Sequence, residues 1–172
     1  MPEQASRRLR TVSVTLRSPD YTSERLYNSV TRILASNMLC SMATQGEKGG
    51  AHINTAFFCF SDDLDCYFLS NPASVHCQNI SRSPQMAIAV FDSHQLWGAA
   101  HKGLQIFGNC ALAEGSAEDD ARELYAARFP AYVKFTDRIS HLRFYSFTPT
   151  AVKILDEDEF GAEVFVMAEV VR

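Results

Sequence analysis

The stretch that decides the fold is residues 39–60, which read LCSMATQGEKGGAHINTAFFCF. Two apolar runs flank a segment with three glycines at residues 45–50. Short apolar runs bounded by glycine are typical of strands joined by a turn. The sequence therefore predicts two strands, Met38–Thr44 and Ala51–Phe60, paired as an antiparallel hairpin.

The same pattern continues on both sides of this hairpin. Upstream, Leu26, Val30, Ile33 and Leu34 fall at helical spacing, which predicts a helix from Thr22 or Ser23 to about Asn37. Downstream, two more helices are predicted, one from Ser74 through Ser81 and one from Ser116 to Arg128. The downstream strands are expected at Cys66–Ser70, Gln85–Phe91, Gly103–Leu112, His141–Phe147 with Ala151–Leu155 (one strand bent at Pro149), and Glu163–Val171 as a further candidate.

Tight turns join most successive strands, which favours antiparallel pairing over parallel crossovers. Closing the sheet would remove its exposed edges. The expected fold is therefore mainly β, a closed antiparallel sheet of about six strands with helices at its ends. At 172 residues the chain is expected to hold one domain, residues 21–172, after a loosely held arm, residues 1–20.

Composition narrows the classes of function. The net charge is −4, which disfavours a general nucleic-acid binder because such proteins need a cationic face. The sequence has no apolar run of membrane-spanning length and no secretory signal, so we expect a soluble cytoplasmic protein without a membrane partner. The five cysteines show no C-x-x-C pair, which favours reduced, buried thiols over a metal site.

Several common motifs are missing from the sequence, including the glycine-rich dinucleotide and P-loop signatures and the zinc-protease motif. The five histidines lie far apart, so no metal site is expected. No side chain stands out as a catalytic acid, base or nucleophile.

One segment is a candidate phosphate site. A strand runs into a helix at Leu69–His76, and free N–H groups at a helix N-terminus attract anions. Ser70 and Ser74 add hydroxyl groups, and His76 adds a further donor or a charge. The simpler alternative is that Ser74 only caps its own helix.

The order of these pieces resembles the pyridoxamine phosphate oxidase-like family of FMN-binding split-barrel flavoproteins. The matching pieces, in order, are the opening helix and the strand Leu39–Thr44, then His52–Phe57 after a glycine turn, the segment Ser74–His76 with its trailing Ser83-Pro84, and Gly103–Gly108. The resemblance covers residues 26–154. It implies a six-stranded antiparallel split β-barrel.

The resemblance also implies a cofactor and a partner. FMN would lie along the strand residues Asn54, Thr55, Ala56 and Phe57. Ser70, Ser74 and His76 would surround its phosphate, and Gln105 would be a further polar contact. The family builds its cofactor sites between two subunits, so a homodimer acting on a small-molecule substrate is implied.

Two departures from the family pattern limit what the resemblance implies. Where the family often has Arg-Lys at the phosphate, this chain has Val75-His76, so permanent charge is replaced by a titratable group. Its C-terminal part carries the acidic run Asp156–Glu159, a poor match for a phosphorylated substrate, so vitamin B6 oxidation is not expected. The sequence favours an FMN-dependent oxidoreductase with an unidentified substrate. The alternative is a non-catalytic flavin- or haem-binding protein, with His141 as the candidate haem ligand; a deazaflavin in place of FMN also stays open.

Overall fold

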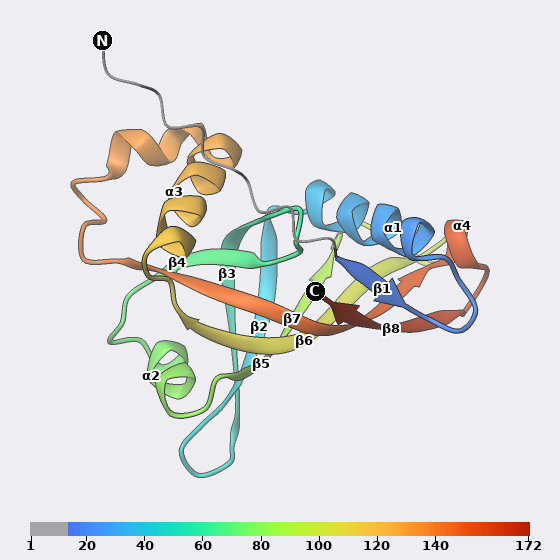
Figure 1. Cartoon of the computed structure of the whole chain (residues 1–172), viewed down its shortest axis with the longest axis horizontal. Helices are drawn as coiled ribbons and strands as arrows, with labels where there is room; N and C mark the ends of the chain where they lie inside the picture. The colour runs from blue at the N-terminus through green and yellow to red at the C-terminus, as the bar shows by residue number, and fades with distance from the viewer. Residues whose placement is uncertain (1–13) are drawn as a thin grey trace.

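The strands form one antiparallel sheet that closes on itself, with the helices packed around it (Figure 1). A computed structural model of the chain describes residues 14–172. The strands are β1 (Thr15–Arg17), β2 (Leu39–Gln45), β3 (Ala51–Phe60), β4 (Cys66–Ser70), β5 (Gln85–Phe91), β6 (Lys102–Leu112), β7 (Arg143–Asp156) and β8 (Phe165–Val171). The helices are α1 (Ser23–Ser36), α2 (Val75–Arg82), α3 (Ser116–Arg128), the 3-10 helix η1 (Pro130–Phe135) and α4 (Glu157–Phe160).

Six of these strands make a barrel. Their order around it is β7-β4-β3-β2-β5-β6, and β6 pairs again with β7 to close the ring. β8 pairs with the second half of β7, and β1 pairs with β8, so these two strands extend the sheet beyond the barrel. The structure thus confirms the six-stranded antiparallel split barrel that the sequence predicted.

The barrel closes at a β-bulge between β6 and β7. The register shifts between Phe107 and Gly108, and Gly108 then lies opposite Pro149. A Cβ atom on Gly108 would lie only 2.1 Å from the carbonyl oxygen of Thr148, so only glycine fits this close approach. β7 therefore continues through Pro149 as one long strand instead of breaking there.

The main core fills the barrel and continues under α1. Leu26, Val30 and Leu34 of α1 are fully buried, as their helical spacing predicted. Arg128, at the end of α3, fastens the C-terminus of α1. Its guanidinium group donates to the carbonyl oxygens of Leu34 and Asn37, where a cation also interacts favourably with the helix dipole.

Two segments near the chain ends are better packed than their sequence suggested. Of the expected arm, residues 1–13 lie outside the described part of the chain, but Thr15–Arg17 forms β1 and Leu16 is buried. Asp156, the first residue of the acidic run, is completely buried. It accepts hydrogen bonds from Ser29 and Arg32 at 2.6 Å each, and these bonds compensate for the buried charge.

Among the described residues, no helix is long and apolar enough to cross a membrane.

Candidate functional site

The site lies where the barrel splits between β3 and β4. These two strands pair only over three residues, Phe58–Phe60 with Cys66–Phe68. The first part of β3, residues 51–57, pairs with β2 on one side, and no other described strand pairs with its opposite edge. Backbone N–H and C=O groups along an unpaired strand edge can bind a ligand.

Helix α2 is fixed beside this open edge by a buried polar network. The Asn79 side chain donates to the Thr44 hydroxyl at 3.1 Å and accepts from Arg82 at 2.8 Å. Thr44 lies on β2, and the register pairs it with His52 of β3. This network holds the second half of α2 against the part of the sheet that carries the open edge.

The structure brings together the three residues expected at the phosphate. The His76 Nε2 atom lies 2.6 Å from the Ser70 hydroxyl and 3.1 Å from the Ser74 hydroxyl. Ser74 occupies the N-cap position of α2, but its side chain makes no capping hydrogen bond to the helix. The first N–H groups of α2 therefore have no side-chain cap, and the polar side chains gather beside them.

The inner face of β3 meets this cluster. His52 stacks on His76, with ring centroids 6.3 Å apart and the ring planes 10° from parallel. Asn54 and Ala56 lie on the same face as His52 because side chains alternate along a strand. His52 was not among the predicted site residues, although its two-residue spacing from Asn54 could have indicated it.

Cys77 and Tyr145 are buried residues that contact the cluster, and no sequence pattern had indicated either of them. Burial alone would raise the pKa of the Cys77 thiol, but hydrogen bonds with His76, Ser74, Tyr145 and Ser70 lower that pKa to about 7. Burial and the hydrogen bond to Cys77 raise the pKa of the Tyr145 phenol. The Cys77 thiol, whose pKa is lowered to about 7, thus lies within hydrogen-bonding reach of the three residues of the candidate phosphate site.

The remaining expected cofactor contacts face the other way. Thr55 and Phe57 alternate with the inner residues of β3, so their side chains lie on the outer face of the sheet. Gln105 is also exposed there, on β6, and β2 and β5 separate it from β3. Within one subunit, the structure therefore does not bring Gln105 to the Ser70–His76 cluster.

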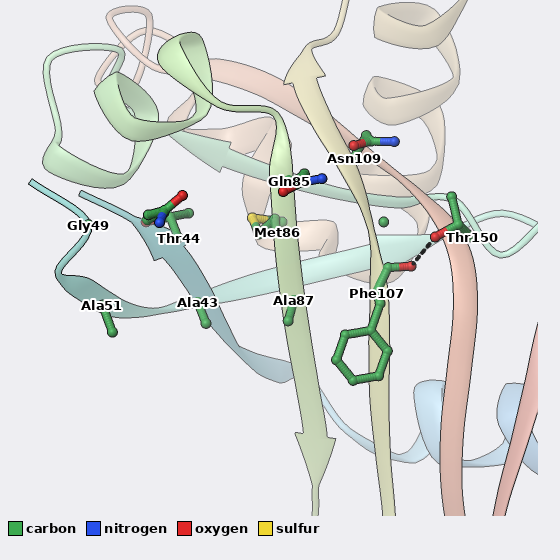
Figure 2. A pocket seen from close by; sticks show the side chains of 12 residues that line it. Ala43, Thr44, Gly49, Ala51, Gln85, Met86, Ala87, Phe107, Asn109 and Thr150 are labelled. Atoms are coloured by element: carbon green, nitrogen blue, oxygen red, sulfur yellow. Dashed lines mark hydrogen bonds between the residues drawn. The ribbon is translucent and has the colours of Figure 1, made fainter. Parts of the chain in front are cut away.

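The outer face of β3, β2, β5 and β6 is apolar and hollowed. Figure 2 shows the side chains of Ala51, Ala43, Ala87 and Phe107 pointing the same way from these four strands. They line part of an open pocket of about 580 Å³. The face also exposes three large side chains, Leu39, Ile53 and Phe57, which are each more than half accessible.

The hydrogen-bond donors of the cluster formed by Ser70, Ser74 and His76 fit a phosphate group. Two hydroxyls, an imidazole and the N–H groups of a helix N-terminus can all donate to phosphate oxygens. Within residues 14–172, no group of three His, Cys, Asp or Glu side chains could hold a metal ion. The arrangement is therefore suited to an anion.

A comparison with models of protein families shows the family to which the chain belongs. The family model described as Pyridoxamine 5'-phosphate oxidase matches residues 28–156, three quarters of the sequence and all six barrel strands. The chain belongs to the pyridoxamine 5'-phosphate oxidase family. This family assignment confirms the resemblance found in the sequence. A search of curated protein sequences found no significant match.

Solved structures of similar fold include two that are described as haem proteins. A haem-binding protein from Mycobacterium smegmatis matches with a TM-score of 0.69 and 15% identity, over 83% of this chain and 57% of that protein. HutZ, the haem storage protein from Vibrio cholerae, matches with a TM-score of 0.60 and 15% identity, over 71% of this chain and 88% of HutZ. A Clostridium acetobutylicum protein related to general stress protein 26, of the pyridoxinephosphate oxidase family, matches with a TM-score of 0.62 and 11% identity. The match covers 83% of this chain and 94% of that protein. At these identities the likeness shows the shared fold alone.

Proposed function

We propose that this family member binds FMN, with the phosphate at Ser70, Ser74 and His76 and the ring system along the open edge of β3. The observation that carries the proposal is the cluster at the start of α2, where three polar side chains converge on one point beside free helix N–H groups. The open edge lies next to this point, so one elongated ligand can reach both.

The protein's part in the chemistry is to bind and orient. When bound, FMN supplies the capacity to pass electrons to or from a small molecule. Ser70, Ser74 and His76 hold the phosphate end, and the backbone of residues 54–57 offers donors and acceptors to the ring. We propose an FMN-dependent oxidoreductase with a small-molecule substrate.

We further propose that a second copy of the chain covers the outer apolar face. Leu39 and Phe57 pair across β2 and β3, and Ile53 pairs with Ala43 beside them. Large contiguous apolar patches on a protein surface usually mark an interaction site. A homodimer through this face would bury these side chains, and it would bring Thr55, Phe57 and Gln105 of one subunit towards its partner.

The test of FMN binding is an absorption spectrum recorded after adding excess FMN and removing the unbound part by desalting. A retained flavin spectrum that differs from free FMN, close to one flavin per chain, is expected. The double substitution Ser74→Ala with His76→Ala should greatly weaken retention. An unchanged affinity in this variant would show that the phosphate lies elsewhere.

Haem is the second candidate ligand, because two of the structural neighbours are described as a haem-binding and a haem storage protein. His141 is exposed just before β7 and is the residue to test. If the purified protein shows a Soret band that His141→Ala removes, haem replaces FMN as the ligand.

A further inference from the structure

The phosphate cluster has no permanent positive charge of its own. Ser70 and Ser74 are neutral, and His76 is charged only when protonated. A phosphate monoester carries close to two negative charges at neutral pH. A charged group in a neighbouring element would therefore strengthen the site.

The sheet register places an arginine directly beside the cluster. Ser70, the last residue of β4, pairs with Arg143, the first residue of β7. Residues paired in this way point to the same face of the sheet, with Cα atoms about 4.5–5.5 Å apart. Two positions along the same face, Phe68 pairs with Tyr145, and the two rings stack 5.5 Å apart. Arg143 therefore leaves the backbone on the face that carries the cluster.

The guanidinium group of Arg143 is held only by neutral partners. Its Nη1 atom donates to the carbonyl oxygens of Ser140 at 2.7 Å and Leu142 at 2.9 Å. Within residues 14–172, Arg143 forms no ion pair, and its side chain is exposed. Hydrogen bonds from a guanidinium to phosphate are roughly twice as strong as those to neutral acceptors. A bound phosphate would thus compete well for this group, which would turn away from the carbonyl oxygens of Ser140 and Leu142 to reach it.

Two other arginines near these elements already have side-chain partners. Arg122 of α3 forms an ion pair with Glu118, and Arg82 at the end of α2 donates to Asn79. Both interactions fasten a helix in place. Arg143 is the arginine that the register sets beside Ser70 and that lacks such a bond.

We propose that Arg143 binds the same phosphate group as Ser70 and His76 and provides the permanent charge of the site. This inference rests on the proposed FMN function and extends it to a residue from β7. In this proposal, the positive charge that the family often supplies at positions 75–76 comes instead from Arg143 of β7, the strand paired with β4.

The test compares Arg143→Gln with Arg138→Gln. Arg138 is an arginine of the same connection whose guanidinium packs over the Phe135 ring, so its substitution makes the same change in net charge. Titrations with FMN, riboflavin and inorganic phosphate are followed by flavin fluorescence and by the NMR signals of the His76 ring. Urea unfolding of each variant checks that the fold is intact.

We expect Arg143→Gln to weaken FMN binding by about 10- to 100-fold, as for loss of a charged hydrogen bond, and to leave riboflavin binding unchanged. Arg138→Gln should stay within about twofold of the wild type, because it removes only a distant screened charge. Arg143→Lys should recover part of the loss, since it keeps the charge but not the forked geometry.

The outcomes separate this inference from the proposed function. If FMN binds tightly and both glutamine variants match the wild type, the role of Arg143 is overturned while the FMN proposal stands. If the wild type binds no FMN but binds inorganic phosphate, the FMN proposal fails. Loss of phosphate binding in Arg143→Gln then still supports the inference, and equal binding overturns it. If the wild type binds neither ligand, both proposals are overturned.

Discussion

Replacing Gly108 with alanine tests how the barrel closes. An added Cβ would lie 2.1 Å from the Thr148 carbonyl oxygen and 2.9 Å from the Pro149 Cα atom. Both atoms belong to the backbone of β7, so no flexible side chain can move aside. Overpacking of this kind costs typically 1–3 kcal/mol, and we expect about 3 kcal/mol because the bulge itself must shift.

The measurement is urea unfolding, with thermal unfolding as a second readout. A loss of about 3 kcal/mol corresponds to a fall in Tm of about 6–12 °C for a chain of this size. The matched control is Gly103→Ala on the same strand, where the nearest atom, the Phe91 Cβ, lies at an ordinary 3.8 Å. We expect this control to stay within about 0.5 kcal/mol of the wild type. Equal stabilities for the two variants would refute the close approach at the bulge.

Three other changes test separate parts of the structure. Asp156→Ala should cost about 2 kcal/mol in urea unfolding at pH 7, because it leaves the buried Ser29 hydroxyl without its acceptor. Burial alone would raise the pKa of Asp156, but hydrogen bonds with Ser29 and Arg32 hold that pKa below its usual value. The stabilisation by ionised Asp156 is therefore present above about pH 4 and is lost as the pH falls through the lowered pKa. If the difference in unfolding free energy between Asp156→Ala and the wild type stayed the same in strong acid, this reasoning would be contradicted. Thiolate absorbance near 240 nm should titrate with a midpoint close to pH 7 in the wild type, and Cys77→Ser should abolish this step; its persistence would assign it to another thiol. Phe57→Lys should convert the proposed dimer to a monomer in size-exclusion chromatography with light scattering, whereas the exposed control Val133→Lys should not; a dimer in both variants would place the interface elsewhere.

The barrel could be predicted from the sequence because its signals are local. Glycine turns separate the apolar runs, and the strand bounds observed for β2 to β6 differ from the predicted ones by at most one residue. Residues Ser116–Asp119 have the sequence pattern of a capping box, but Gly115 holds the N-cap position with a positive φ and Ser116 is already helical. Serine favours both a cap and a first turn, so local sequence does not distinguish the two positions.

The contact between Ser70, Ser74 and His76 could be predicted because the three residues lie within seven positions of one another. The residues that were missed come from other elements. The β4–β7 register sets Tyr145 opposite Phe68 and Arg143 opposite Ser70, and this register depends on how distant strands pair. The buried role of Asp156 depends in the same way on α1, more than 120 residues earlier in the chain. Contacts of this kind leave no pattern in a single sequence.

The phosphate site is tested most directly by titrating the wild-type protein with FMN and with riboflavin in a calorimeter at pH 7. The two ligands share the ring system and differ only in the phosphate. The proposed site predicts that FMN binds at least about 100-fold more tightly, because several charged hydrogen bonds are made to the phosphate alone. Equal affinities would contradict a phosphate site at Ser70, Ser74 and His76.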